Sequence, residues 1–215
     1  MKRLFDTVVS AVALIVLSPI FLLLALGVWL SDPGPVLFRG QRMGLGARPF
    51  AILKFRSMRR SPVAGRQITV KGDPRITPFG RVLRKTKLDE LPQLINVLRG
   101  DMSLVGPRPE SPAYAPFYTP QEWAVLSVRP GITGMAQIYF RNEEGLLRGS
   151  DPERYYREVI LPTKLAFDLE YVHNQSFWLD LKLLVLTAVA LVWTVAPPPV
   201  RQPTEPNPIA ARTGT

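Results

Sequence analysis

Residues 7–30 read TVVSAVALIVLSPIFLLLALGVWL, an apolar block without a charged side chain. A straight helix of this length would measure about 36 Å, enough to cross the roughly 30 Å hydrocarbon core of a bilayer. The block is too long for a cleaved signal peptide and lacks an A-x-A-like cleavage site. The sequence therefore predicts that the N-terminal part of the fold is a membrane segment.

The block is interrupted at its middle by Ser18 and Pro19. Proline lacks a backbone donor and clashes with the preceding helical turn, so it bends or breaks a helix. The Ser18 hydroxyl can satisfy a carbonyl that the break frees, which makes a sharp bend tolerable in lipid. Two shapes stay open: a kinked spanning helix and a re-entrant helix-break-helix hairpin.

Basic residues flank both ends of the block: Lys2 and Arg3 precede it, and Arg39, Arg42 and Arg48 follow it. Because basic flanks favour the cytoplasmic side, a spanning helix would have to export one of them. A hairpin that leaves through the leaflet by which it entered exports neither. The charge pattern therefore favours the re-entrant shape, with both ends of the block on the cytoplasmic side.

The rest of the chain is strongly basic. The formal net charge is +10, and the stretch from Arg39 to Arg108 holds sixteen Lys or Arg residues against four acidic ones. Such an excess favours nucleic acid, an anionic membrane surface or phosphorylated substrates as partners. Cysteine is absent and His173 is the single histidine, which excludes disulfides, thiolate sites and histidine-rich metal centres. Any metal would then have oxygen ligands, and magnesium is the natural choice.

The pattern beyond the membrane segment predicts an α+β fold that is mainly helical. Residues 36–58 show two short strands around the turn GLGARP, which predicts a small β-hairpin, and residues 61–78 form a polar loop. Residues 153–172 and 176–195 have helical spacing. Only about 14 uncharged residues follow Lys182. Because these are too few to span a bilayer, we expect the last helix to be amphipathic and interfacial.

Two adjacent carboxylates, Asp89 and Glu90, lie within the basic region in the stretch KLDELPQ at residues 87–93. Apolar residues recur at helical spacing over 88–99, which predicts a helix with Asp89 at its N-cap and Glu90 in its first turn. One interpretation is that the pair only stabilises this helix N-terminus. The other is that the surrounding cations bind a phosphorylated substrate that a carboxylate attacks.

The second interpretation rests on the cations beside the pair. Arg84, Lys85 and Lys87 precede it directly, and Arg108 follows. Such a cluster is expected to lower the pKa of Asp89 and keep it ionised, and arginine forks suit the oxygens of a diphosphate. An ionised aspartate facing a neutralised phosphate is the arrangement of an aspartyl-phosphate nucleophile, with magnesium bridging carboxylate and phosphate.

Three stretches together resemble one known family: KLDELPQLINVLRGDMSLVGPRP at residues 87–109, PFAILKFRSM at 49–58 and RPGITGMAQI at 129–138. They are similar to the bacterial sugar transferases, the monotopic phosphoglycosyl transferases that begin exopolysaccharide, O-antigen and glycoprotein glycan assembly. The resemblance extends from residue 1 to about residue 195 and includes the Ser-Pro break. The chain resembles the minimal catalytic-domain form, without the multi-span N-terminal extension of longer members.

The resemblance implies a reaction and its site residues. A sugar 1-phosphate would pass from a UDP-sugar to undecaprenyl phosphate through an aspartyl-phosphosugar intermediate, with release of UMP. Asp89 would be the nucleophile and would hold Mg2+. Glu90, its dyad partner, would activate the lipid phosphate or help to hold the metal. Asp180, which could equally cap the last helix, is a further candidate metal ligand. The positions that match basic residues around the family's site are Lys54, Arg84, Arg108, Arg129 and Arg141.

The resemblance also implies a location and partners. The protein would be a monotopic protein of the bacterial inner membrane with its active site on the cytoplasmic face. It would work beside membrane lipids and downstream glycosyltransferases, and a homodimer stays open. Residues 1–31 would form the re-entrant membrane helix, 32–195 the catalytic domain with an interfacial C-terminal helix, and 196–215 a disordered proline-rich tail. QIYFRN at residues 137–142 departs from the QVNGRN of shorter members, which leaves the surroundings of Arg141 and the choice of sugar open.

Two other classes of protein would share some of these features. A nucleic-acid-binding protein is basic, but the basic region lacks an aromatic stacking pattern and zinc-ligand spacing, so no nucleic acid is expected. A non-enzymatic membrane scaffold would account for the apolar segments and the charge, but not for a carboxylate pair set among arginines. UMP release from a UDP-sugar would exclude the scaffold.

Overall fold

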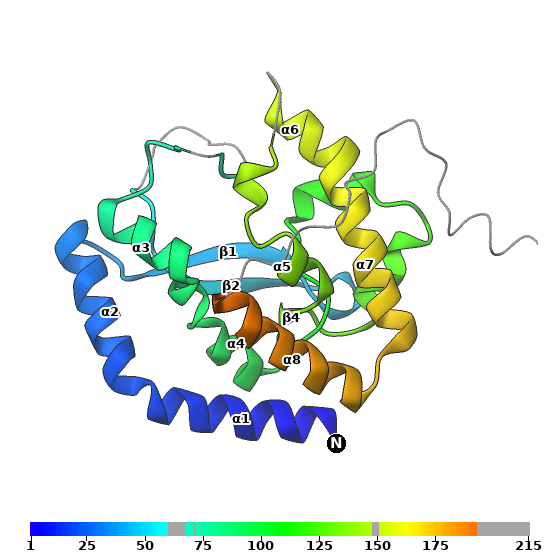
Figure 1. The fold of residues 1–215 in the computed structure, drawn as a ribbon, viewed down its shortest axis with the longest axis horizontal. Coiled ribbons are helices and arrows are strands. Elements are labelled where there is room, and N and C mark those ends of the chain that lie inside the picture. The colour runs from blue at the N-terminus through cyan, green and yellow to red at the C-terminus, as the bar shows by residue number, and fades with distance from the viewer. Residues whose placement is uncertain (60–67, 71, 148–150, 193–215) are drawn as a thin grey trace, which may run out of the picture.

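In the computed structural model of the protein, residues 1–59, 68–70, 72–147 and 151–192 are described, and the predicted proline-rich tail lies outside them (Figure 1). The described part is mainly helical with two small sheets, which confirms the α+β prediction. The α-helices and strands are α1 (Lys2–Val16), α2 (Ser18–Ser31), β1 (Leu37–Met43), β2 (Pro49–Phe55), α3 (Pro78–Thr86), α4 (Gln93–Arg99), β3 (Ser103–Val105), β4 (Gly131–Thr133), α5 (Met135–Tyr139), α6 (Pro152–Tyr155), α7 (Leu161–Asn174) and α8 (Phe177–Val192). The 3-10 turns are η1 (Leu45–Ala47), η2 (Leu88–Glu90), η3 (Pro112–Phe117), η4 (Glu122–Ser127) and η5 (Glu143–Gly145), and η6 (Tyr156–Ile160) is a π-helical turn.

The N-terminal apolar block forms two helices. α1 ends at Val16, α2 begins at Ser18, and the pair is bent by 65°. Pro19 lies in the first turn of α2, where its missing N–H breaks no hydrogen bond, and the Ser18 hydroxyl donates to the Ile15 carbonyl at 2.7 Å. The predicted break is therefore confirmed. Among the described residues no single helix is long and apolar enough to cross a bilayer, whereas this bent pair meets the length and composition criteria together.

Both ends of the bent pair are attached to the same folded domain. At the start of α1, Lys2 Nζ donates to the Asp180 carboxylate of α8 at 2.5 Å, and Arg3 donates to carbonyls in the last turn of α4. At the end of α2, the Arg56 guanidinium donates to the Asp32 carbonyl and pairs with its carboxylate. In Figure 1, α1 runs beneath the domain and α2 rises along one side of it.

α1 also contributes a buried carboxylate to its contact with β3. Asp6 is 2% exposed and accepts hydrogen bonds from the Ser103 hydroxyl at 2.7 Å and from the Leu104 amide at 3.3 Å. A buried carboxylate without such partners would strongly destabilise the fold. The first two turns of α1 are therefore an integral part of the domain.

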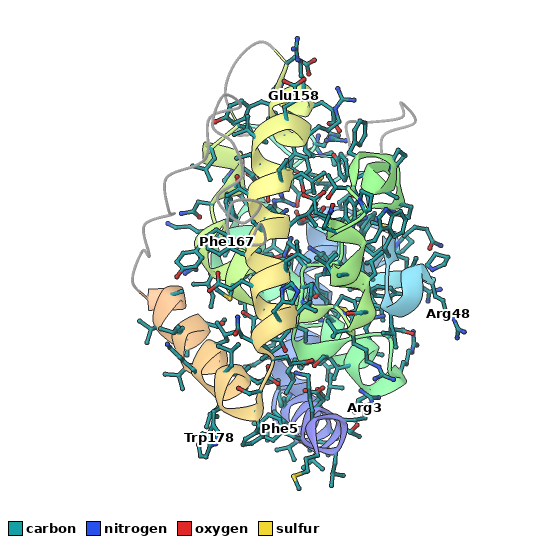
Figure 2. All side chains as sticks on the ribbon, turned by 90° about the vertical axis from the view of Figure 1, so that its right-hand side faces the viewer. Arg3, Phe5, Arg48, Glu158, Phe167 and Trp178 are labelled. Atoms are coloured by element: carbon teal, nitrogen blue, oxygen red, sulfur yellow. The ribbon has the colours of Figure 1, made fainter. Side chains whose placement is uncertain are left out.

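The outer faces of α1, α2 and α8 expose apolar side chains. Leu23 and Trp29 on α2 are 68% and 50% exposed, and Trp178 on α8 is 75% exposed. Phe5 of α1 contacts Phe177 of α8 edge-on, with ring centroids 5.5 Å apart. Figure 2 shows Phe5 and Trp178 at the same end of the molecule. An exposed apolar surface of this extent is typical of a membrane contact.

The two sheets frame the centre of the domain. β1 and β2 form the predicted antiparallel hairpin, which pairs Leu37 with Phe55 at its open end. β3 and β4 pair in parallel, which the sequence analysis did not predict. Glycine permits this pairing, because a Cβ on Gly131 would lie 2.1 Å from the Gly106 amide nitrogen. The loop that follows β3 is thereby held close to the loop that precedes β4.

α2 packs on α3, a helix that the sequence analysis also did not predict. Gly27 permits the close approach, because a Cβ there would lie 2.5 Å from the Phe79 ring. Val28 and Leu83 are buried in the same contact. The hydroxyl of Thr77 caps the N-terminus of α3, and a proline follows it, so a start signal was present in the sequence. This packing ties the position of α3 to the bent helix pair.

The C-terminal helices follow the prediction. The pattern over 153–172 corresponds to α6, the π-helical turn η6 and α7 in succession, and α8 occupies 177–192 of the range predicted as 176–195. Tyr156 and Ile160 of η6 are fully buried and pack with residues of α7. One face of α7 therefore lies in the core of the domain.

Candidate active site

A cavity of about 1600 Å³ opens between the β1–β2 hairpin, α3, η2, α5 and α7. Its wall is rich in charged side chains from segments far apart in the sequence. All the site residues predicted from the sequence except Arg129 and Asp180 contribute to it. Its ionisable residues include Arg42, Lys54, Arg84, Lys87, Asp89, Glu90, Arg108, Glu110, Arg141, Glu143, Glu144 and Lys164.

The carboxylate pair follows a sharp change of chain direction at the end of α3. Lys87 adopts the left-handed conformation, with φ 61° and ψ 14°, and η2 then carries Asp89 and Glu90. A regular helix resumes only after Pro92, which cannot donate a backbone hydrogen bond, so the predicted single helix over 88–99 with Asp89 at its N-cap is wrong. A left-handed conformation costs a non-glycine residue about 1–2 kcal/mol. Such strained positions are concentrated at functional sites.

Glu90 is held by two cations. Its Oε1 accepts a hydrogen bond from Lys54 Nζ at 2.7 Å, and Arg108 Nη2 lies 3.5 Å from the same oxygen. Burial alone would raise the pKa of Glu90, but the attraction of Lys54 and Arg108 outweighs it and holds the pKa well below its ordinary value. The carboxylate is therefore ionised and a poor proton acceptor. Its main effect in this structure is to orient two cations at the cavity.

Asp89 has a different environment. The residue is 5% exposed, and its Oδ1 has no hydrogen-bond partner among the described residues. Burial raises the pKa of Asp89, and the nearby Lys54 offsets only part of the increase. The prediction that cations lower this pKa is therefore wrong, because burial removes more stabilising hydration than the cations replace. A buried, unpaired carboxylate oxygen on a cavity wall is suited to bind a cation or to attack an electrophile.

The other cations of the cavity differ in their partners. Arg84 Nε donates to Glu144 Oε1 at 3.2 Å, and Lys87 Nζ donates to the Arg141 carbonyl at 2.9 Å. The Arg141 guanidinium makes no hydrogen bond or ion pair with any residue that the structure describes. The Glu144 carboxylate thus pairs with Arg84 where a substrate phosphate could bind instead. The Arg141 guanidinium is available to bind an anion.

Two predicted site residues lie elsewhere. Arg129 Nε donates at 2.9 Å to the carbonyl of Gly100, the residue after α4, and Arg129 is not among the residues that line the cavity. Asp180 accepts hydrogen bonds from Lys2 at 2.5 Å and from the Tyr171 hydroxyl at 2.6 Å, which places it with α1 rather than with the dyad. It does not cap α8 either, because the Ser176 hydroxyl accepts from a first-turn amide at 3.2 Å. The structure supports neither residue in its predicted role.

The donor set suits one mode of magnesium binding. Within residues 1–59, 68–70, 72–147 and 151–192, no three His, Cys, Asp or Glu side chains are grouped to hold a metal by themselves. The unpartnered Asp89 Oδ1 is one available ligand, whereas Glu90 Oε1 is engaged with Lys54. Magnesium commonly binds through one or two carboxylates together with substrate phosphates and water. The residues present therefore fit an ion shared with a phosphorylated substrate.

Comparison with known proteins assigns the chain to a family. The family model described as bacterial sugar transferase matches residues 1–194. The chain belongs to the bacterial sugar transferase family. The resemblance stated from the sequence is thereby confirmed, and the match to this family spans the bent helix pair and the cavity-forming domain together.

Relatives of this sugar transferase come from several bacteria. It is 42% identical over 197 residues to the UDP-glucose:undecaprenyl-phosphate glucose-1-phosphate transferase of Caulobacter vibrioides, covering 90% of this chain and 70% of that protein. It is 39% identical over 201 residues to the UDP-N-acetylgalactosamine-undecaprenyl-phosphate N-acetylgalactosaminephosphotransferase of Aeromonas hydrophila, covering 90% of this chain and 44% of that protein. It is 41% identical over 198 residues to an exopolysaccharide production protein of Rhizobium leguminosarum bv. phaseoli, covering 88% of this chain and 94% of that protein. The chain therefore spans less than half of some relatives and nearly all of others.

In this sugar transferase, two buried charged residues of α7 contact the segments that carry cavity residues, and neither was predicted from the sequence. Lys164 of α7 is 2% exposed and donates to Glu110 at 2.5 Å and to Glu143 at 3.0 Å. Asp168, one turn later, accepts from the Arg108 amide at 3.2 Å, and burial raises its pKa to about 8. A lysine and an aspartate four residues apart on an otherwise apolar helix face were the available signal.

Proposed function

We propose that this chain transfers a sugar 1-phosphate from a UDP-sugar to undecaprenyl phosphate, with release of UMP. The observation that carries the proposal is Asp89, a buried carboxylate that lines the cavity with Lys54, Arg84, Arg108 and Arg141 and whose Oδ1 has no hydrogen-bond partner among the described residues. These four cations can neutralise a diphosphate that would otherwise repel a carboxylate. Membership of the family and the activities named for the relatives support the same reaction.

In the proposed first step, the Asp89 carboxylate attacks the β-phosphorus of the donor. The bond between that phosphorus and the oxygen bridging the two phosphates breaks, and UMP leaves with this oxygen and its electron pair. A carboxyl–phosphate bond then joins the sugar phosphate to Asp89. Lys54 and Arg108, oriented by Glu90, are placed to stabilise the charge of the phosphoryl oxygens during the transfer.

In the second step, an oxygen of undecaprenyl phosphate attacks the same phosphorus, and the bond to Asp89 breaks to restore the carboxylate. The product is undecaprenyl diphosphate-sugar. A phosphate monoester with a second pKa of about 6 is mostly ionised at neutral pH and needs no strong base. The low pKa of Glu90 agrees with this requirement. Magnesium, when bound at Asp89 and the donor phosphates, would supply additional neutralisation of phosphate charge.

The test is UMP release from a panel of donors. The relatives are named for glucose and N-acetylgalactosamine donors, so the panel pairs UDP-glucose and UDP-N-acetylgalactosamine with their C4 epimers, UDP-galactose and UDP-N-acetylglucosamine. With undecaprenyl phosphate and magnesium in lipid nanodiscs, we expect continuous UMP release from at least one donor. The release should stop when a chelator removes the magnesium. Release of UDP in place of UMP, or no release from any donor, would contradict the proposal.

We further propose that the bent helix pair is a re-entrant hairpin in the cytoplasmic leaflet of the bacterial inner membrane, with the domain after Asp32 on the cytoplasmic face. The ties of Lys2 and Arg3 at one end and of Asp32 at the other support this, because both ends meet one domain. Each half of about 12 apolar residues reaches only roughly 18 Å, too short to cross a bilayer alone. Such an anchor would hold Asp89 near the level of the lipid phosphate.

Cysteine labelling tests this topology in a chain that contains no cysteine. A single cysteine inserted after Met1 should resist a membrane-impermeant maleimide in intact cells and react after permeabilisation. Arg48→Cys, on an exposed turn of the domain, is the matched cytoplasmic reference and should behave identically. The double change Ser18→Ala, Pro19→Leu should straighten the helix, make the N-terminal cysteine reactive from outside and lower activity. Reaction of that cysteine from outside in the otherwise native chain would contradict the re-entrant topology.

A further inference from the structure

α7 carries a buried lysine at the back of the active-site cavity. Lys164 is 2% exposed, and its Nζ donates to Glu110 at 2.5 Å, Glu143 at 3.0 Å and the Tyr156 hydroxyl at 2.9 Å. These three bonds use all the donors of an ammonium group. Lys164 is therefore fully engaged with protein groups, and no donor remains for a substrate phosphate.

The two carboxylates that Lys164 joins belong to the loops that carry two cavity arginines. Glu110 follows Arg108 by two residues, and Glu143 follows Arg141 by two residues. Both arginines line the cavity, although they lie in separate segments, before η3 and before η5. One buried ammonium group therefore connects the two loops directly behind their arginines.

The two loops differ in how much other support they have. The Arg108 amide donates to Asp168 at 3.2 Å, and the Pro107 carbonyl accepts from the Gly131 amide at 2.8 Å. In addition to the bond from Lys164, the Arg141 loop is held by Lys87 on the Arg141 carbonyl and by Arg84 on Glu144, and the Arg84–Glu144 pair is partly exposed to solvent. Loss of the Lys164 contact should therefore displace Arg141 more than Arg108.

We propose that Lys164 is a positioning residue that sets the separation of Arg108 and Arg141, so that both guanidinium groups contact one donor diphosphate. The inference rests on the proposed function, because it concerns the binding of the UDP-sugar. It assigns a role to a buried charge that the transfer steps themselves do not use. A buried ion pair that served stability alone would leave the affinity for the donor unchanged.

The test removes the Arg141 arm of this link and leaves the pair of Lys164 with Glu110 intact. Glu143→Ala should raise the KM for the UDP-sugar about tenfold, the loss expected for one hydrogen bond to a charged group, with kcat and the KM for undecaprenyl phosphate within about twofold. Glu143→Gln retains an oxygen that accepts from Lys164 and should restore most of the donor affinity. Glu158→Ala, which removes an exposed ion pair with Arg154, is the control. Figure 2 shows Glu158 at the opposite end of the molecule from Phe5 and Trp178.

A double-mutant cycle with Arg141→Met distinguishes positioning from an independent effect. If Glu143 acts through Arg141, adding Glu143→Ala to Arg141→Met should change the donor KM by less than about twofold. Equal effects of Glu143→Ala in both backgrounds, or an unchanged donor KM in the folded single variant, would overturn the inference.

Lys164 itself needs a variant that does not leave a buried carboxylate unpaired. The double change Lys164→Met, Glu110→Gln neutralises both partners at similar volume, and its fold is checked by its thermal midpoint. A folded double variant with native donor KM would also overturn the inference. A wild-type chain that neither releases UMP nor binds UDP in a calorimetric titration would instead contradict the proposed function. If the wild type releases UMP but the effects of Glu143→Ala and Arg141→Met on the donor KM are additive, only the positioning role is contradicted and the proposed function stands.

Discussion

Asp89→Asn should reduce UMP release by at least about 10³-fold, the scale seen when a catalytic nucleophile is removed. The amide is nearly isosteric but carries no negative charge and cannot displace UMP. Because Asp89 Oδ1 has no hydrogen-bond partner among the described residues, the exchange breaks no contact that holds the fold. UMP release is measured with the productive donor, and a radiolabelled sugar phosphate should remain covalently attached to the wild-type protein when the lipid acceptor is omitted.

The matched control is Asp151→Asn, at the N-cap of α6. Asp151 accepts from the Arg154 amide at 3.0 Å, and an asparagine can make the same bond, so this variant should keep wild-type activity. Both variants should remain in the membrane fraction with thermal midpoints close to the wild type. If Asp89→Asn retained more than a few per cent of activity, or still captured the labelled sugar phosphate, another nucleophile would be required.

Glu90→Gln should slow the reaction about 10²-fold, comparable to the loss of one charged stabiliser in a preorganised site. The reason is that Lys54 and Arg108 lose the ionised carboxylate that orients them at 2.7 and 3.5 Å. Because the same two cations would serve both phosphoryl transfers, the initial burst of UMP and the subsequent lipid transfer should both slow. Rapid-quench measurement of the two half-reactions checks this result.

Two other outcomes would assign Glu90 a different role. A normal UMP burst with blocked lipid transfer would indicate that Glu90 activates the lipid phosphate. Loss of both half-reactions with recovery at high magnesium would indicate that it helps to hold the metal. Glu90→Asp, which keeps the charge on a shorter side chain, should recover more activity than Glu90→Gln only if the negative charge is what matters.

The parts of the fold that depend on local chemistry could be predicted. Pro19 cannot continue the hydrogen bonds of a helix, and the break falls beside it. The glycine-rich turn after Met43 separates two β-patterned runs, and the hairpin forms there. By contrast, the parallel β3–β4 pair joins two three-residue strands far apart in the sequence, where no periodicity can develop. Short non-local pairings of this kind depend on the assembled domain.

In the candidate active site too, features that depend on neighbouring residues could be predicted, and features that depend on the folded domain could not. Arg84, Lys87 and Arg108 were grouped with Asp89 and Glu90 because they are near in the sequence, whereas Lys54 and Arg141 were assigned to the site by the resemblance. The direction of the Asp89 pKa shift was not predicted, because burial is a property of the folded chain. Arg129 and Asp180 were assigned by the resemblance alone, and the structure gives both of them other partners. Lys164 was missed because its two carboxylate partners lie 54 and 21 residues away in the sequence.

The N-terminal helix pair cannot be removed from this domain without the loss of interior contacts. Asp6 lies buried on β3, and Lys2 neutralises an Asp180 that is 4% exposed. Deleting α1 would therefore leave the Ser103 hydroxyl without its carboxylate partner and Asp180 without its cation, so that, among the described residues, the Asp180 carboxylate would keep only the hydrogen bond from the Tyr171 hydroxyl. The first residues of the chain act as an interior element of the domain. Removal of the N-terminal helix pair is thus a change to the core of this protein.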